Sequence, residues 1–565
     1  MTLFFGRSLF TKTSRVKALI FSKAASNLKL PHFHYNDNQK FSFFRKNKGF
    51  FLLVGVCSLA TGIGLSAVIL AREEKELRYK HVVIGAGVAA RACVRELNAL
   101  DDQELPEGYD GKVLMVGDNS RMNTIGYTDQ DREDYSKFLE EPSNTVLMGH
   151  YATKLDVQKK TVQLHEGTVV SFDKCFVATG GVYPSLKNVQ PSAESHVTTF
   201  HRKCDLEHII DKSQNGEFQH VVVVGGGSLG TEVALELKRR GSPDLKVSQI
   251  YAEPGVIHRN LPDYFRAYCT ALLRSKGIDQ RNFSLVTNVE TDSKGKLQLT
   301  IDSWDQYTME ADHVIFAPTH IDARNELAVE AGLEIDQNNS GVVVNKELLA
   351  FSDVYFGGDV ASCPSSIFGR IRVQNYNHAR ATGTLAARNM LGGREVYNDI
   401  PTSEVFLTEI NMKHNLVGIV DAKLETVGLW EVNKNKKGKT EDQHFFTSRY
   451  NKGVVFYLSE GKIVGMLLTN LNESSHVEKA RNIISGQVDY SDLTRQEIEL
   501  ECKEKFKAEL NQPLVRSTFS KGNRESKRET SHNPYKNRRH AEKPLTRRPS
   551  DTIRDSNTNL YWRSS

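Results

Sequence analysis

Two glycine-rich turns constrain the fold of this chain more than any other feature of its sequence. The segment Val221–Arg240, VVVVGGGSLGTEVALELKRR, runs from four β-branched residues through three glycines into an amphipathic stretch. Residues 82–97, VVIGAGVAARACVREL, have the same pattern. Each segment predicts a strand, a tight turn and a helix whose N-terminus faces a dinucleotide pyrophosphate. The sequence therefore predicts two dinucleotide-binding folds in one chain.

In the first of these segments, Gly85 makes the turn, Gly87 lets the backbone approach the pyrophosphate, and Ala90 allows close packing of helix on strand. The later stretch KVLMVGD predicts the next strand, and Asp118 at its end is placed to bind a ribose diol. The intervening DDQELPEGYDG predicts a surface loop.

Two further segments support a flavin site. CFVATGG, at Cys175–Gly181, predicts a strand that ends in a Thr-Gly-Gly turn. DVYFGGDVAS, at Asp353–Ser362, predicts a strand that ends in Gly-Asp. In flavoproteins that bind two nucleotides, the chain leaves the FAD domain at the first such segment and returns to it at the second. We therefore expect Asp359 to meet the ribityl and phosphate region of FAD.

The second glycine-rich segment is nested between these two flavin signals. Gly225, Gly227 and Gly230 form its GxGxxG, and KVSQIYAEPG supplies Glu253 at the end of the next strand. An acid there binds a free 2′-hydroxyl and repels a 2′-phosphate, so it favours NAD(H) over NADP(H). One segment then holds a flavin and the other a nicotinamide, and a hydride can pass between the two.

The seven cysteines exclude some classes of protein. No two are close enough for a CxxC or CxxxxC pair, which argues against a disulfide framework, a zinc site and a flavin disulfide reductase. Scattered reduced thiols are the expectation.

The N-terminal part predicts mitochondrial targeting. Residues 1–30 hold six Lys or Arg residues and no acid, which is typical of a presequence; a disordered basic tail is the alternative. Residues 50–71 carry no charge, and at about 1.5 Å each they reach across a bilayer core. We expect a transmembrane helix there, with a buried core helix as the alternative. The positive charges before it place the body in the intermembrane space.

The charge of the chain is distributed unevenly. The total is +5, of which residues 1–49 carry +9 and residues 515–565 carry +8, leaving −12 for residues 50–514. The C-terminal segment is poor in large apolar residues and cannot bury enough surface to fold alone. Its YKNRRHAEKPLTRRPS is suited to phosphates or to a nuclear address, with a plain solvated tail as the alternative.

Taken together, these segments resemble the apoptosis-inducing-factor family of mitochondrial flavoproteins over residues 79–490. The resemblance rests on VVIGAGVAA, KCFVATGG, VVVVGGGSLGTEVALEL, AGLEID, VYFGGDVAS, GRIRVQNYNHARATGTLAARNM and GVVFYLSEGKIVGMLL. It implies an α/β fold with two nested Rossmann-like domains of the glutathione-reductase type, for FAD and NAD, and a C-terminal α+β domain. It also implies slow NADH oxidation, an NADH-dependent homodimer, respiratory-chain biogenesis through an intermembrane-space import partner, and relocation to the nucleus in cell death.

The expected divisions are a presequence at 1–49, a transmembrane helix at 50–71, an FAD-binding domain at 79–200 and 321–398, an NAD-binding domain at 201–320, a dimerisation-like α+β domain at 399–490 and a basic disordered tail at 511–565. By position, the family's FAD contacts fall on Gly85, Gly87, Ala90, Asp118, Arg202, Asp359, Asn375 and Tyr376, and its NAD contacts on Gly227, Ser228, Leu229, Gly230, Glu253 and Arg259. Glu232 matches the acid that the family places beside the isoalloxazine, so it is the candidate catalytic residue.

The chain departs from the family's pattern around the nicotinamide. The stretch that should supply a lysine partner for Glu232 reads NSRMNTIGYTDQDREDYSK, where Lys137 is a speculative substitute. The other departures are Pro318 and Thr319 for Val-Gly, Ser228 for an aromatic residue, Gln374 and Asn375 for Glu-His, and Leu407 for a tryptophan. Stacking aromatics orient the rings between which hydride passes. We therefore expect FAD binding, weaker NAD(H) binding, and slow or absent charge transfer.

Two classes of function stay open at this point. One is an FAD-dependent NADH oxidoreductase that passes electrons to a quinone or another acceptor. The other is a flavin-stabilised scaffold for intermembrane-space import, in which Thr426–Val432 offers a sheet edge to a partner's strand. A third expectation is that the released body binds DNA through its basic surface and tail.

Overall fold

The computed structural model describes residues 77–117 and 144–431, apart from the single positions 102, 106, 202 and 294, together with residues 450–510. It also gives the backbone of four short strands before and after these ranges. The chain divides into two compact units, one of residues 1–77 with 163–171 and the other of residues 78–162 with 172–565.

The transmembrane helix predicted at residues 50–71 is wrong for both ends of that range. There the first unit has β2 (Phe50–Leu53) and β3 (Ile69–Arg72), which pair antiparallel and continue to β1 (Lys46–Asn47). The ends of the apolar run satisfy their backbone groups across a ladder rather than along a helix. Residues 54–68 lie outside the described part of the chain, as do residues 1–45. Within the described part, no helix has the length and apolar character needed to cross a bilayer.

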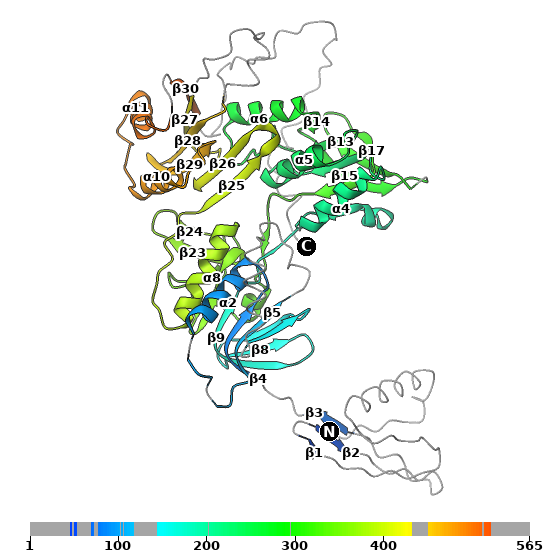
Figure 1. Cartoon of the computed structure of the whole chain (residues 1–565), viewed down its shortest axis with the longest axis vertical. Coiled ribbons are helices and arrows are strands. Elements are labelled where there is room, and N and C mark those ends of the chain that lie inside the picture. Colours follow the sequence, from blue (N-terminus) through cyan, green and yellow to red (C-terminus); the bar gives the residue numbers. More distant parts are fainter. Residues whose placement is uncertain are drawn as a thin grey trace. The chain divides into compact units, whose positions relative to one another are not determined.

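The first of the two predicted Rossmann-like layers, most of which belongs to the second unit, is a mixed sheet in the order β21-β22-β9-β4-β5-β6. Figure 1 labels its strands β9, β4 and β5. Its strands are β4 (Leu77–Ile84), β5 (Gly111–Gly117), β6 (Asn144–Met148), β9 (Val169–Val177), β21 (Leu349–Phe351) and β22 (Val354–Phe356), and β7 (Ala152–Asp156) and β8 (Thr161–Leu164) form an attached pair. Helices α2 (Val88–Leu100) and α8 (Tyr376–Met390) pack on each other. Cys175 of β9 pairs parallel with Val354 of β22, so the chain leaves this sheet and returns to it, as the sequence predicts.

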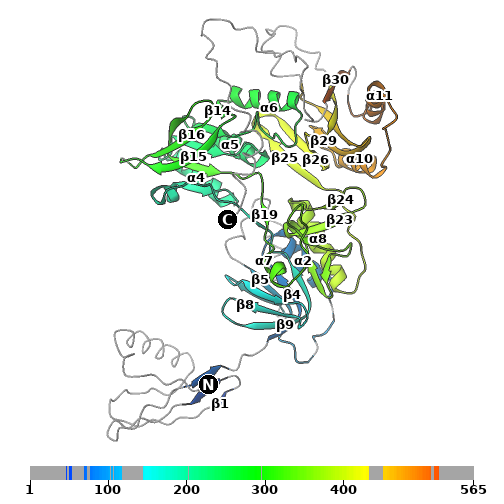
Figure 2. The same cartoon turned by 180° about the vertical axis from the view of Figure 1, so that it is seen from behind.

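The second Rossmann-like layer is inserted between β9 and β22. Its sheet has the order β11-β18-β12-β13-β14, and every pair in it is parallel. Figure 2 labels the edge strand β14 of this sheet. The strands are β11 (Val197–Thr199), β12 (His220–Val224), β13 (Lys246–Ile250), β14 (Ile278–Arg281) and β18 (His313–Phe316), and the helices are α4 (Lys203–Gln214), α5 (Ser228–Arg240) and α6 (Asp263–Ser275). An antiparallel sheet of β15 (Leu285–Thr291), β16 (Leu297–Asp302) and β17 (Tyr307–Ala311) is added after β14. The predicted nested α/β fold is confirmed.

Short elements connect the two layers. The outgoing strand β10 (Gly181–Val182) pairs antiparallel with the returning strand β19 (Asp322–Ala323), so both crossings of the chain run side by side. The remaining short elements are η3 (Pro191–His196), α7 (Glu326–Glu330), β20 (Val342–Val343), η4 (Gly358–Val360), β23 (Ala361–Ser365) and β24 (Gly369–Ile371).

A six-stranded antiparallel sheet follows, in the order β25-β26-β29-β28-β27-β30. Its elements are β25 (Thr402–Leu407), η5 (Thr408–Ile410), β26 (Met412–Gly418), β27 (Glu425–Glu431), β28 (Gly453–Ser459), β29 (Lys462–Thr469), α10 (Ser474–Ser485), α11 (Arg495–Lys505) and β30 (Leu514–Ser520). The prediction that residues 511–565 lack structure is wrong for β30, because an unpaired edge of β27 supplies the hydrogen bonds that this short segment cannot make alone. Residues 521–565 lie outside the described residues.

The second Rossmann-like sheet and the C-terminal sheet share one hydrophobic core. Phe265 of α6 lies against Trp430 of β27, with ring centroids 4.5 Å apart, and both side chains are fully buried. Tyr457 of β28 donates its hydroxyl proton to the carbonyl of Asn260, at 2.5 Å. Side chains from both layers therefore hold α5 and its glycine turn against the C-terminal sheet.

Candidate functional site

The first glycine turn leaves space for a phosphate where the sequence predicts it. Gly85 has a φ of +130°, and a Cβ there would lie 2.3 Å from the carbonyl oxygen of Ala178, so only glycine fits. Gly87 caps α2, and a Cβ placed on it would meet no atom within 4 Å. The space in front of the helix N-terminus is open to an anion, which the helix dipole attracts. Ala90 is fully buried behind it.

The returning segment brings Asp359 to this turn. Asp359 lies in η4, directly after Gly358, whose φ is +69°. A Cβ on Gly358 would lie 3.1 Å from the Cβ of Ala89 in α2. The Gly358 N–H donates to Thr382 Oγ1 of α8 at 2.9 Å. This glycine therefore lets η4, which carries the acid expected at the ribityl chain, approach both α2 and α8.

Arg372 is a residue of this region that the sequence analysis missed. Its guanidinium donates to the carbonyl oxygens of Asp359, at 3.1 Å, and Ile321, at 2.8 Å. Burial lowers the pKa of Arg372 from its ordinary value. Gln374 also donates to the Ile321 carbonyl. These hydrogen bonds join the turn that carries Asp359 to the segment at Ile321, where the chain returns to the FAD-binding domain. A local sequence pattern does not indicate them, because Arg372 and Ile321 lie far apart in the sequence.

Asn375 and Tyr376 lie at the start of α8. Asn375 is its N-cap, and its Oδ1 accepts the His378 N–H at 2.8 Å. This position holds a flavin-facing histidine in the family that the sequence resembles, and here its side-chain oxygen caps the helix. Contact of these two residues with a cofactor stays a prediction.

The second glycine turn has the same geometry with one difference. Gly225 has a φ of +137°, and a Cβ there would lie 2.1 Å from the carbonyl oxygen of Ala317. Gly230 lies so close to this turn that its Cβ would be 2.3 Å from the Gly225 carbonyl oxygen. A Cβ on Gly227, the N-cap of α5, would lie 2.4 Å from Thr319 Cγ2. The threonine methyl therefore covers the glycine that corresponds to the open Gly87.

Thr319 also carries a polar atom inside this region. Its Oγ1 is buried and has no hydrogen-bond partner. A buried hydroxyl without a partner is costly, so the atom is suited to a ligand's oxygen or nitrogen. Ser228 and Leu229, the first two residues of α5, follow Gly227 directly. Leu229 packs against the shared core.

The loop after β13 places the acid predicted to bind ribose. Glu253 follows this strand and is half-buried. The Ile257 N–H donates to the carbonyl of Gly226 at 2.6 Å, which folds the loop back over the glycine turn. Arg259 is exposed, and its carbonyl accepts the Ala422 N–H at 2.7 Å. The structure thus brings Glu253 and the second turn together.

Glu232 occupies a half-buried position on α5, one turn after Gly227. Its Oε1 accepts the backbone N–H of Phe406 from β25, at 2.6 Å. Burial raises the pKa of the Glu232 carboxyl to about 7 although this hydrogen bond lowers it. Within the described residues, Glu232 forms no ion pair. A carboxyl with this pKa can hold or release a proton at Oε2 near neutral pH, as a redox site requires.

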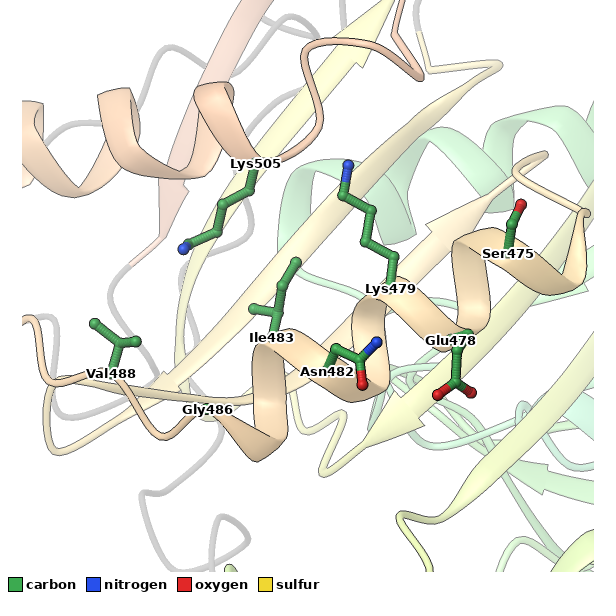
Figure 3. A pocket seen from close by; sticks show the side chains of 8 residues that line it. All are labelled: Ser475, Glu478, Lys479, Asn482, Ile483, Gly486, Val488 and Lys505. Carbon is green, nitrogen blue, oxygen red and sulfur yellow. The ribbon is translucent and has the colours of Figure 1, made fainter.

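Three sequence predictions fall outside the described residues. These are Asp118, Arg202 and Lys137. The structure also has a pocket that no predicted site residue lines (Figure 3). It lies over α10 and reaches Lys505 of α11, with Lys479 and Ile483 at its centre. Lys479 donates to Glu509 Oε1 at 2.5 Å. The pocket has no element in common with either glycine turn.

The donor groups fit the two dinucleotides predicted. The open helix N-terminus at Gly87 and the nearby Asp359 suit FAD, and the second turn with Glu253 suits NAD(H) despite the Thr319 methyl. When bound, these cofactors supply hydride donor and acceptor. The chain's own groups bind phosphates, hold the ribose and keep a proton at Glu232.

Comparison with known proteins agrees with this geometry. Residues 79–383 match a family described as pyridine nucleotide-disulphide oxidoreductase, and residues 431–486 match one described as apoptosis-inducing factor, mitochondrion-associated, C-term. The chain is 29% identical over 443 residues to apoptosis-inducing factor 1, mitochondrial, of Dictyostelium discoideum, covering 74% of this chain and 80% of that protein. It is 27% identical over 340 residues to the ferredoxin–NAD(+) reductase subunit of the Pseudomonas putida benzene 1,2-dioxygenase system, covering 57% and 76%.

A solved structure shares the fold. The covalent putidaredoxin reductase–putidaredoxin complex includes a chain that superposes with a TM-score of 0.59 at 20% identity, covering 76% of this chain and 99% of that one. The family match spans more than half of the sequence and contains both glycine turns. The chain is therefore an apoptosis-inducing-factor-like member of the pyridine nucleotide-disulphide oxidoreductase family, and it is an FAD-dependent NAD(H) oxidoreductase.

Proposed function

We propose that this protein is a mitochondrial flavoprotein that binds FAD firmly and accepts hydride from NADH slowly. The observation that carries the proposal is the Thr319 methyl over Gly227, 2.4 Å from where a Cβ would be. Hydride transfer needs nicotinamide and flavin rings within about 3.5 Å of each other. A side chain at the glycine that the pyrophosphate approaches displaces the dinucleotide and so lengthens that distance.

A second observation supports a slow rate. Leu407, at the end of β25, is fully buried and stands where the family resemblance implies a stacking tryptophan. A leucine fills space but does not present a flat face to a ring. Glu232, next to the neighbouring Phe406, still provides a carboxyl with a pKa near 7. The proposed site therefore keeps the carboxyl that holds a proton, but it has no aromatic side chain at residue 407 to orient the nicotinamide ring.

Stopped-flow mixing of the FAD-loaded protein with NADH, without oxygen, tests this proposal. We expect Thr319→Ser, which removes only the methyl group, to speed flavin bleaching on the order of tenfold, since about 1.4 kcal/mol of barrier corresponds to that factor. Thr319→Val keeps a methyl group there and serves as the matched control, with a rate no faster than that of the wild type. Rapid bleaching of the wild type, with a stable long-wavelength band, would contradict the proposal.

The mitochondrial part of the proposal is supported by the relatives' names and by the presequence-like composition of residues 1–30. On the resemblance alone, we also propose roles in respiratory-chain biogenesis and in caspase-independent cell death. Import into isolated mitochondria, with and without residues 1–49, tests the location. Equal import of both forms would oppose it.

The second candidate function is a flavin-binding scaffold with little NADH oxidase activity. It is favoured by the edge of β27, along which the seven-residue strand β30 of the chain's own C-terminal segment pairs antiparallel. The edge expected to be open is thus already paired with β30, so a partner's strand has to displace β30 before it can add there. NADH turnover that stays undetectable in every Thr319 variant would favour the scaffold.

A further inference from the structure

Two aromatic side chains lie beside the acid of the second dinucleotide turn. Glu253 follows β13 and Phe283 follows the neighbouring strand β14, where Ile250 pairs with Arg281. The Phe283 N–H donates to the carbonyl oxygen of Glu253 at 3.3 Å. Asn282 Nδ2 donates to the carbonyl of Pro254, at 3.2 Å. These two bonds fix Phe283 to the segment that carries the ribose-binding acid.

Both aromatic rings are exposed to a degree that packing alone does not explain. The Phe283 side chain is 46% exposed, and Trp304, in the turn between β16 and β17, is 76% exposed. Their ring centroids are 6.3 Å apart and their planes meet at 60°. Phe283 also has a φ of +53°, which is unfavourable for a bulky residue. A strained, exposed phenylalanine that packs on an exposed tryptophan beside a ribose-binding acid indicates a binding role.

We propose that Phe283 and Trp304 form an aromatic platform for the adenine ring of NAD(H). Ligands of parallel α/β sheets bind at the carboxyl ends of the strands, and β13 and β14 both end here. The acid after the second strand of such a fold holds the ribose that carries adenine. The base attached to that ribose then reaches the second residue after the next strand, β14 (Ile278–Arg281). Phe283 is that residue.

An aromatic platform changes how affinity is divided along the dinucleotide. Base–aromatic stacking contributes on the order of tenfold or more in affinity for each stacked base. The nicotinamide end has the Thr319 methyl and the buried Leu407 where a close, ring-stacking contact is expected. The platform holds the adenosine end, so NAD(H) binds chiefly through adenosine. The inference rests on the assignment of the second turn to NAD(H).

Binding of ADP-ribose to the FAD-loaded full chain tests the platform without any nicotinamide chemistry. We expect Phe283→Asn to weaken this binding about tenfold, because the loss of one stacked base costs about that factor. Asparagine tolerates a positive φ, so the loop keeps its backbone. Phe283→Tyr retains a ring and should bind as the wild type does. Tyr151→Ser, which removes an exposed aromatic ring from the β6–β7 loop, is the matched control.

Tryptophan emission provides a second measurement. The chain has three tryptophans, and Trp430 is fully buried. ADP-ribose should quench wild-type emission, and Trp304→Phe should remove that response while weakening binding less than Phe283→Asn does. Flavin reduction by reduced nicotinamide mononucleotide, which lacks adenosine, should be the same in all variants.

Equal ADP-ribose affinity in the wild type and Phe283→Asn would overturn the platform and leave the NAD(H) assignment in place. No ADP-ribose binding by the wild type would overturn both. A selective loss of reduction by reduced nicotinamide mononucleotide in Phe283→Asn would also overturn the platform, because Phe283 would then act at the other end of the dinucleotide.

Discussion

Glu232 shows how one half-buried side chain links the fold to its chemistry. The carboxylate lies under Phe406 of β25, and burial raises its pKa from about 4.5 to about 7. A carboxyl whose pKa is raised on folding stabilises the protein fully below its unfolded pKa. This contribution is lost as pH rises through the folded pKa, because the buried group must then ionise. The relevant window runs from about pH 4.5 to about pH 7.

The substitution Glu232→Gln should therefore remove part of the pH dependence of stability. We expect the FAD-loaded variant to be more stable than the wild type by about 1–3 kcal/mol at pH 8, and equal to it near pH 4.5. Urea unfolding at both pH values measures the difference. Glu236→Gln is the control, since Glu236 pairs with Arg239 on the surface of α5 and should give no gain at pH 8. A difference independent of pH would contradict the assignment.

The sequence predicted the residues of the two turns better than their surroundings. Gly85, Gly87, Gly225 and Gly230 lie where the motif requires them, because a tight turn is a local property of the backbone. The motif also identified Thr319 as a departure. It could not show that the Thr319 methyl lies on Gly227, since that contact joins segments about ninety residues apart.

Among the elements, β30 differs most from what the sequence predicts. Its seven residues lie in a segment with little apolar content, so no pattern marks them as a strand. The edge of β27 instead supplies the hydrogen bonds that hold these residues as a strand. Antiparallel pairing runs from Thr426 opposite Ser520 to Glu431 opposite Leu514, with a bulge after Trp430. Such an edge accepts another strand of suitable length when β30 is removed.

A chain that ends at Leu510 should bind the peptide LVRSTFS in trans. We expect saturable binding by fluorescence anisotropy, and binding at least about tenfold weaker to the full chain, where β30 is tethered at an effective concentration near millimolar. The control peptide carries proline at the positions of Ser517 and Thr518. Of two neighbouring backbone N–H groups in a strand, one points toward the partner strand. Two consecutive prolines remove both N–H groups, so this peptide cannot form the central hydrogen bond with β27. Equal binding of the two peptides would show that no strand adds to β27.

For the whole molecule, the sequence predicted the order of the layers but not their shared core. The nested insertion follows from local signals, because each of the four strand ends carries its own glycine or acid. The contact of Phe265 with Trp430 joins α6 to β27, and only the folded chain brings them together. The predicted helix at 50–71 is wrong at both ends for a related reason, since an apolar run alone does not distinguish a helix from paired strands.

The charge distribution of the whole chain decides where DNA can bind. Without residues 1–49 the net charge is −4, and without residues 521–565 as well it is −11. An acidic body repels a polyphosphate, so we propose that any DNA contact is made by the basic tail. Two Arg-Arg pairs, at 538–539 and 547–548, concentrate its charge.

We therefore expect residues 50–565 to bind a short DNA duplex with an affinity that falls steeply with salt. If about five basic residues contact phosphates, log K should fall against log salt concentration with a slope of about −4.5. Replacing the four paired arginines with glutamine should make the slope shallower, since each lost phosphate contact removes about 0.9. A chain ending at Ser520 keeps β30 and should not bind at about 150 mM salt. If that shortened chain binds with the same slope, the contact lies on the folded body and the tail is a solvated extension.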